Sequence, residues 1–356
     1  MSSTDRADPP STRPTYTPWQ LHRVWDRIDF PSRFRYEPGE FSKEVVRHHD
    51  GHGFLSALMT HSLAYIPFEN LELHYSPHHQ ISIHPDALFE KIVRQNTGRG
   101  GYPLENNVFL GTVLRSFGFE VMSVGARLNT LYESNGESNG EHRFAGWSHM
   151  VNLVTIRGET FLVDVGFGSG GPTQPIPLVE NEETVIESTQ ERMRLRRDAI
   201  AENEYQGNKL WILERQVFAD GHWTALYCFE DFVCFLPQDF EVMHFHASTH
   251  RTSFFTYRVI VMKYLLDARG ESVVGELILR GDRVLRQTKN KLEVLAMLYT
   301  EEDRVESLEK YFNITLTQAQ AAGIRGMVTE LPSRHSDQII AGKDEPEGVM
   351  LDGVTA

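Results

Sequence analysis

The residues of this chain that could carry chemistry fall into small groups, and most groups lack the spacing that a known type of site requires. Gly166, Gly168 and Gly171 match the glycine spacing of a dinucleotide-binding loop. Such a loop needs a following helix whose N-terminus faces the pyrophosphate, and the proline-rich sequence from Pro172 prevents one. We therefore exclude a dinucleotide fold, whereas a glycine loop that brings backbone N–H groups close to a ligand remains open.

Histidine and cysteine give no metal or nucleophile motif of their own. Histidines cluster at 48–52, 74–79 and 244–250, but none of the clusters has HExxH spacing or a neighbouring cysteine pair. We interpret them as polar surface and expect no metal site. Cys228 and Cys234 lie among aromatic residues, which favours two small buried hydrophobic side chains. The sequence also contains neither a nucleophile elbow nor a P-loop.

Composition excludes several classes of protein. The 356 residues carry a net charge of −14, which disfavours general binding to nucleic acid or to anionic membranes. A hydrophobic fraction of 40% is enough for a substantial core. Two cysteines cannot form a disulfide framework, and no apolar run has the length of a membrane span or signal peptide. We therefore predict a soluble, cytoplasmic globular protein.

The elements that must position any site change in type along the chain. From Trp19 to Phe119 the apolar spacing is helical; Pro85 and Pro103 begin two of the helices and Gly118 ends the second. Alternation with period two then predicts strands on both sides of an Arg157-Gly158 turn.

Further strands are predicted in the segments LWILERQ, WTALYCF, FFTYRVIVMKYL and VVGELILRGDRVLRQ, and the closing stretch KLEVLAMLYTEEDRVESLEKYFNI returns to helical spacing. This order of elements predicts an α+β fold. The two ends, 1–14 and 333–356, are predicted to be loose tails, and the ESNG repeat at 133–140 to be a solvated loop.

Seven segments in order carry a resemblance to a known family. They are IPFENLELH (66–74), GRGGYPLENN (98–107), GWSHMVNLV (146–154), FLVDVGFG (161–168), QPIPL (174–178), DFEVMHFHASTHRTSFF (239–255) and LEKYFNITL (308–316). From about Trp19 to Leu316 the chain resembles the arylamine N-acetyltransferases. The resemblance implies a helical N-terminal domain at 15–125, a β-barrel domain at 126–238 and an α/β lid at 239–332.

The resemblance also implies a reaction. Enzymes of this family use a Cys-His-Asp triad: the thiolate takes an acetyl group from acetyl-CoA and passes it to an arylamine. A thiol needs a histidine and a helix N-terminus to become a thiolate near neutral pH, and the aspartate orients the imidazole. The family histidine falls on His149 and the aspartate on Asp164. The family cysteine position holds Pro103, which suits the first turn of a helix but cannot be acylated.

The same resemblance assigns binding residues. Those implied on the substrate side are Ser148, Phe167 and Gly168, and those implied beside the coenzyme are Gly146, Thr252 and Ser253.

Three hypotheses of function follow. In the first, His149 and Asp164 promote direct acyl transfer from acyl-CoA to an aromatic amine or related small metabolite, without an acyl-cysteine. In the second, the pair serves a cyclisation or isomerisation in secondary metabolism. In the third, the protein is a catalytically inactive homologue. The first hypothesis makes acyl-CoA a co-substrate and a small molecule, from xenobiotic or secondary metabolism, the other partner. It predicts no permanently bound cofactor and no nucleic-acid or membrane partner.

Overall fold

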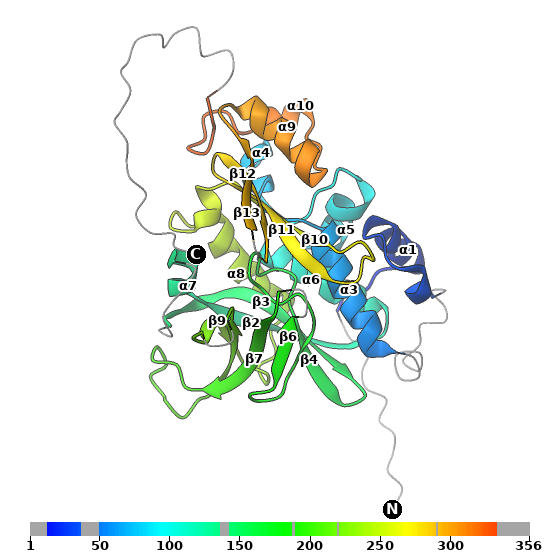
Figure 1. Cartoon of the computed structure of the whole chain (residues 1–356), viewed down its shortest axis with the longest axis vertical. Helices are drawn as coiled ribbons and strands as arrows, with labels where there is room; N and C mark the ends of the chain where they lie inside the picture. The colour runs from blue at the N-terminus through cyan, green and yellow to red at the C-terminus, as the bar shows by residue number, and fades with distance from the viewer. Residues whose placement is uncertain are drawn as a thin grey trace, which may run out of the picture.

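The structure is a computed structural model that describes residues 13–36, 50–135, 142–186, 189–218, 221–289 and 291–332. Most of the predicted tails and of the ESNG repeat lies outside these residues. In the described ranges no helix is long and apolar enough to cross a membrane. Figure 1 shows a five-stranded sheet at one end of the molecule, an eight-stranded sheet at the other, and α3 and α6 beside the region where they meet.

The N-terminal part is mainly helical, as predicted. Its elements are α1 (Pro18–Arg27), η1 (Ser32–Phe34), α3 (Gly51–Tyr65), β1 (Phe68–Glu69), α4 (Glu72–Tyr75), α5 (Pro85–Phe89), η2 (Glu90–Arg94) and α6 (Pro103–Ser116). Pro18, Pro85 and Pro103 each occupy a first-turn position, where proline loses no helical hydrogen bond. The helix from Pro85 changes to π-type hydrogen bonding over Glu90–Arg94.

The middle part forms an antiparallel sheet in the order β5-β4-β3-β2-β9-β8-β7-β6. Its strands are β2 (Glu120–Asn129), β3 (Phe144–Ile156), β4 (Glu159–Val163), β5 (Ile176–Pro177), β6 (Glu183–Ile186), β7 (Glu191–Asp198), β8 (Leu210–Gln216) and β9 (Thr224–Phe229), with α7 (Thr130–Asn135) after β2. A bridge between Glu180 and Leu195 links the segment after β5 to β7, so the sheet nearly closes into a barrel. The predicted Arg157-Gly158 turn joins β3 to β4, with positive φ at both residues.

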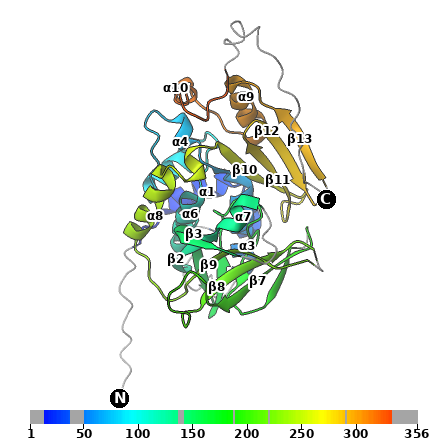
Figure 2. The same ribbon diagram turned by 90° about the vertical axis from the view of Figure 1, so that its left-hand side faces the viewer.

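The C-terminal part forms the second sheet, in the order β1-β10-β11-β12-β13. Its elements are α8 (Pro237–Thr249), η3 (Phe254–Thr256), β10 (Ile260–Leu266), β11 (Val273–Arg280), β12 (Arg283–Thr288), β13 (Lys291–Met297), α9 (Glu301–Phe312) and α10 (Gln318–Ala322). Because β1 pairs with β10, the helical part contributes a strand to this sheet. Figure 2, turned by 90°, also shows this sheet and the barrel at opposite ends of the molecule.

Two predictions about elements need correction. The stretch from Lys291 to Met297 is a strand and not the start of a helix, because it pairs with β12 along its whole length. Its Leu292 and Val294 are exposed, so the apolar spacing there does not report a buried helical face. The strand predicted from Phe254 begins only at Ile260, after the short turn η3. The domain bounds stay a prediction; β2 runs across the expected boundary between 125 and 126.

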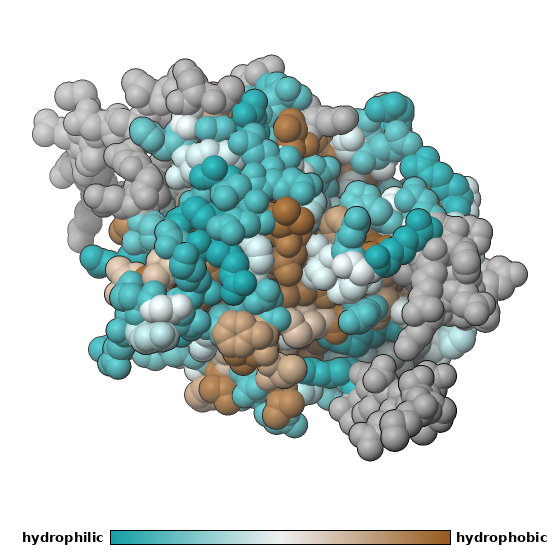
Figure 3. Space-filling model, turned by 90° about the horizontal axis from the view of Figure 1, so that it is seen from below, coloured by the Kyte–Doolittle hydropathy of each residue, from teal (hydrophilic) through white to brown (hydrophobic). Residues whose placement is uncertain are grey.

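The largest core cluster joins all three parts of the chain. It packs Leu58 and Leu110 of the helices with Val154 of the barrel and Met262 of the C-terminal sheet. Viewed from the barrel end, the surface is mainly polar, with a band of hydrophobic residues across its middle (Figure 3). Because the core cluster includes residues of both sheets, the helices pack the two sheets against each other. Pro103, His149 and Asp164 are also buried in the interior of the molecule.

Candidate active site

His149 and Asp164 meet on neighbouring strands of the barrel. His149 lies within β3, and Asp164 directly follows β4, its hairpin partner. The His149 Nε2 and Asp164 Oδ2 atoms are 2.7 Å apart, and the two side chains are fully buried. Ser148 forms a β-bulge, because Trp147 and His149 pair with consecutive residues of β2. Bulges re-aim side chains, and this one precedes the histidine. The predicted hydrogen bond between His149 and Asp164 is therefore present.

The Asp164 carboxylate is held from several directions. Its Oδ1 accepts the Asn107 amide at 2.8 Å and the Gly166 backbone N–H at 2.8 Å. Asn107 also donates to the Met150 carbonyl at 2.6 Å and accepts the Val165 N–H at 3.0 Å. Burial by itself would raise the pKa of Asp164, but the His149 imidazole and these hydrogen bonds lower it below the ordinary value. Asp164 is thus kept ionised and fixed in orientation.

We expect Asn107→Ala to reduce the free energy of unfolding by about 2–4 kcal/mol, since it leaves buried polar partners, one of them a carboxylate, without a hydrogen bond. Denaturant titration measures the change. Asn106→Ala is the matched control: Asn106 is also buried on α6, its Oδ1 has no partner, and it makes no bond to Asp164. Equal losses in the two variants would contradict the role given to Asn107.

The other ring nitrogen of His149 has no hydrogen-bond partner among the residues that the structure describes. His149 Nδ1 is buried without a hydrogen bond. Because Nε2 faces an ionised carboxylate, the tautomer that pairs with it carries the ring proton on Nε2 and leaves a lone pair on Nδ1. The rings of Phe167 and Tyr227 lie 6.0 and 5.2 Å from the imidazole, centre to centre. Burial and the adjacent Asp164 charge raise the pKa of Tyr227 well above its ordinary value. Tyr227 therefore stays protonated.

Pro103 begins α6 beside the loop that follows Asp164. Its carbonyl would lie only 2.4 Å from a Cβ at position 166, so Gly166 is what lets the helix and loop approach this closely. The helix start is capped by Glu105, which accepts the Tyr102 backbone N–H at 3.2 Å. The Tyr102 hydroxyl in turn bonds His244 Nδ1 at 2.6 Å. Position 103 is therefore placed at a helix N-terminus beside the loop that follows Asp164, but it carries no nucleophilic atom.

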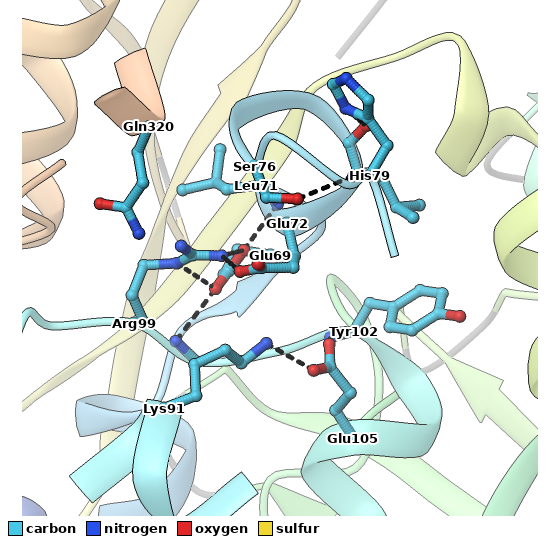
Figure 4. A network of polar contacts seen from close by, with 12 residues as sticks. Glu69, Leu71, Glu72, Ser76, His79, Lys91, Arg99, Tyr102, Glu105 and Gln320 are labelled. Atoms are coloured by element: carbon cyan, nitrogen blue, oxygen red, sulfur yellow. Dashed lines mark hydrogen bonds and ion pairs between the residues drawn. The ribbon is translucent and has the colours of Figure 1, made fainter. Parts of the chain in front are cut away.

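A buried charge network supports the segment before Pro103 (Figure 4). Arg99 donates to Glu69 at 2.8 Å and to Glu72 at 3.1 Å, and Lys91 forms a close ion pair with Glu105. Burial opposes ionisation of Glu69, but the Arg99 and Lys91 charges and the hydrogen bonds lower its pKa to about 2. Glu105 has the opposite balance: burial, with the nearby Glu69 charge, raises its pKa to about 7 despite Lys91.

The raised pKa of Glu105 predicts a pH-dependent stability. As pH rises above about 4.5, glutamate loses its proton in the unfolded chain, whereas in the folded protein Glu105 keeps it until about pH 7. The folded state is therefore penalised progressively between these values, by roughly 1–3 kcal/mol in total. We expect Glu105→Gln, which retains the acceptor for Tyr102, to become more stable relative to the native protein across this window. Unfolding free energies of the two proteins, measured from pH 4.5 to 7.5, provide the test; a constant difference would contradict it.

Of the remaining predicted residues, some lie close to His149 and others lie at the surface. Phe167 contacts the His149 ring, and Gly168 lies over the Phe68 ring. Ser253 donates to the Ala247 carbonyl at 2.6 Å, and Phe255, two residues later, packs edge-on against Tyr102. Gly146 lies on β3, three residues before His149, and is exposed, as is Thr252 in the loop after α8. The structure thus joins Phe167 directly to the His–Asp pair.

The expectations for histidine and cysteine need two corrections. His74 and His244 are buried, because each bonds to main-chain carbonyls, those of Phe255 and Ile81 respectively. Cys234 is exposed, since it lies in the surface loop between β9 and α8, whereas Cys228 is buried as predicted. Within the described ranges no group of three or more His, Cys, Asp or Glu side chains is placed to hold a metal ion.

Sequence reasoning missed Asn107 and Tyr227. A signal for Asn107 was present, because it follows Pro103 by four residues and so shares a helical face with it. Tyr227 had no local signal, since only the pairing of β9 with β2 brings it to His149.

These parts together define an acyltransferase fold: a helical part, a nearly closed barrel with a buried His–Asp pair, and a C-terminal sheet. The family model described as N-acetyltransferase matches residues 53–321. The chain belongs to the arylamine N-acetyltransferase family. The predicted family and fold class are therefore confirmed.

Among curated relatives, the chain is similar to the N-malonyltransferase FDB2 of Fusarium pseudograminearum, at 38% identity over 87% of this chain and 93% of the relative. It is 28% identical to human arylamine N-acetyltransferase 1, over 57% of this chain and 67% of that protein.

Among solved structures, the Salmonella typhimurium arylamine N-acetyltransferase has a TM-score of 0.66 at 22% identity, covering 87% of this chain and 98% of that chain. The Mycobacterium marinum enzyme in complex with CoA has a TM-score of 0.63 at 25% identity, covering 85% of this chain and 98% of that one.

Proposed function

We propose that this protein transfers an acyl group directly from acyl-CoA to the amine of an aromatic or related small metabolite, with His149 as the general base. The observation that supports this most is the arrangement of the imidazole: Nε2 is held by Asp164, whereas Nδ1 is buried with no hydrogen bond to any described residue. A base oriented in this way accepts a proton from whatever binds against Nδ1. Acyl-CoA is the co-substrate in this proposal.

The proposed step is a single displacement. The amine nitrogen attacks the thioester carbonyl carbon, and a proton of the amine passes to His149 Nδ1. The carbon–sulfur bond then breaks, and the departing CoA thiolate takes that proton from the imidazolium. The products are an amide and CoA, and Asp164 stabilises the transient imidazolium. Binding both substrates together supplies the proximity that a covalent intermediate would otherwise provide.

The acyl group is proposed by similarity. Because the chain is 38% identical to an N-malonyltransferase over most of its length, malonyl-CoA is the first donor to test, with acetyl-CoA second. Phe255 packs against Tyr102, the residue before α6, and Ser253 donates to the Ala247 carbonyl of α8. Thr252 and Ser253, in the loop that leads to Phe255, are proposed to contact the coenzyme.

We expect native protein to form no covalent acyl-enzyme, because Pro103 offers no nucleophile. Two measurements check this. Initial rates at varied donor and acceptor should give intersecting double-reciprocal lines, as a ternary complex requires. Intact-mass spectrometry after incubation with malonyl-CoA or acetyl-CoA alone should show no added acyl group.

Other results would point elsewhere. Parallel lines together with an acyl group on a residue next to His149 would reveal a replacement nucleophile. CoA binding without turnover of any amine would favour an inactive homologue. If the protein neither binds CoA nor acylates an amine, the second hypothesis is favoured, in which the His–Asp pair serves a reaction other than acyl transfer. That second hypothesis gains its support from the proline at the nucleophile position.

A further inference from the structure

The glycine loop, residues 166–171, is bound from outside the barrel by two side chains of the C-terminal sheet. The Tyr264 hydroxyl donates to the Gly168 carbonyl at 2.8 Å, and the Ser169 hydroxyl donates to Glu276 Oε1 at 2.6 Å. Tyr264 on β10 and Glu276 on β11 are direct partners in the antiparallel register, so their side chains lie on one face of the sheet. Two paired residues on adjacent strands of the C-terminal sheet thus bind two consecutive residues of the glycine loop.

The barrel holds the loop from another direction. A Cβ at position 170 would lie 2.3 Å from the Tyr132 hydroxyl and 2.5 Å from Arg215 Nη1, so the loop backbone packs directly on these two groups. Arg215 is fixed in turn by a bidentate ion pair with Glu191, at 2.6 and 3.1 Å. The loop therefore cannot shift toward the barrel without breaking this packing.

Glu276 is an unusual residue for such a place. It is 7% exposed, and its Oε2 atom is buried with no hydrogen-bond partner in the described part of the chain. Burial raises its pKa, although Ser169 and the Arg215 charge oppose the increase. An unpaired buried carboxylate oxygen disfavours folding, so a role other than stability better explains the residue.

We propose that Tyr264 and Glu276 are positioning residues that keep Phe167 against His149 by holding the glycine loop. Phe167 is the second residue of that loop, and its ring stands edge-on to the imidazole at 82°. Through these two hydrogen bonds the C-terminal sheet fixes the ring that packs against His149, and so sets which acceptors reach Nδ1. The claim that the loop selects the acceptor substrate rests on the proposed function, whereas the claim that Phe167 shields His149 does not.

The test measures the accessibility of His149 independently of turnover. Diethyl pyrocarbonate acylates accessible neutral imidazoles, and peptide mass spectrometry reads residue 149 separately from the other histidines. We expect the Ser169→Ala/Tyr264→Phe double variant to raise the labelling rate of His149 about tenfold, because both bonds to the loop are lost. Glu276→Gln retains an acceptor oxygen for Ser169, so its labelling should stay within about twofold of native.

Matched controls separate loop release from general loosening. Tyr299→Phe and Glu293→Gln change the same residue types at exposed or half-buried positions around the same sheet, away from the loop, and should leave His149 labelling unchanged. A double variant with native melting temperature and native labelling would overturn the proposal.

Turnover adds a second readout. If acyl transfer is observed, the double variant should raise KM for the acceptor several-fold and leave KM for acyl-CoA near its native value. If no form of the protein turns over, the proposed function fails, but the labelling result still decides the role of Tyr264 and Glu276. If the double variant turns over with a native KM for the acceptor and native labelling of His149, the positioning role is rejected and the proposed function stands.

Discussion

Removing the basic nitrogen of His149 is expected to lower turnover by about 10²–10⁴-fold, the usual contribution of a positioned general base. His149→Gln is the better variant, because a glutamine amide can still donate to Asp164 Oδ2, whereas alanine would leave that buried oxygen without its partner and destabilise the fold by about 1–3 kcal/mol. Rates at saturating acyl-CoA and amine measure the loss. Calorimetric titration with CoA should give an affinity within about twofold of native, since the imidazole is not proposed to bind the coenzyme.

A companion substitution tests the role of Asp164 in orienting the imidazole. In Asp164→Asn the amide can donate to Nε2, which places the ring proton on Nδ1 and removes the basic lone pair. Turnover should then fall by about 10³–10⁴-fold, although the imidazole remains. Full activity in either the His149→Gln or the Asp164→Asn variant would place the chemistry elsewhere in the protein.

Installing a thiol at position 103 is expected to create the nucleophile that this chain lacks. Position 103 is the first residue of α6, and its backbone lies against Gly166, two residues beyond Asp164. A cysteine at a helix N-terminus near a histidine has its pKa lowered from about 8.5 to below about 7.5. In Pro103→Cys we therefore expect rapid alkylation by iodoacetamide below pH 7 and an acyl adduct after incubation with acyl-CoA. The kinetic pattern should change from intersecting to parallel lines.

The native cysteines determine how this experiment is built. Cys234 is exposed and would react with the reagent, so Cys234→Ser serves as the background for every variant. Cys228 can stay, because burial raises the pKa of its thiol to about 12. Pro103→Ala controls for the lost proline restraint on φ, which is expected to cost about 0.4–1 kcal/mol. Adding His149→Gln should return the new thiol to ordinary reactivity. A thiol with pKa near 8.5 in the folded Pro103→Cys variant would show that the site no longer supports a thiolate.

Much of the local structure could be predicted from the sequence, because local backbone preferences generate it. Pro103 begins a helix wherever that helix packs, and the Arg157-Gly158 turn closes a hairpin through its own positive φ angles. The strand from Leu210 to Gln216 begins with a run of four apolar residues, which is typical of a strand buried on both faces. The family motifs likewise located His149, Asp164 and the missing cysteine, since motif order is a property of the chain alone.

Where a segment lacks a local preference, long-range pairing decided its structure. The residues from Lys291 to Met297 suit a helix or a strand about equally, and the ladder with β12 made them a strand. Long-range contacts also decided the burial of His74 and His244, because the carbonyls that bond their ring nitrogens lie far away in the sequence, at Phe255 and Ile81.

The sequence alone therefore determined the family, the fold class and the identity of the His–Asp pair, together with the absence of a nucleophile at position 103. Only the tertiary structure decided how that pair is held and shielded. Asn107 reaches Asp164 from α6, Tyr227 reaches His149 across the barrel, and Glu276 reaches Ser169 from another sheet. Each contact joins residues 15 or more positions apart in sequence, as His149 and Asp164 also are. Hydrophobic periodicity reports which face of an element is buried, but not which distant element covers it, and the partner is what fixes the direction and charge of a buried polar side chain.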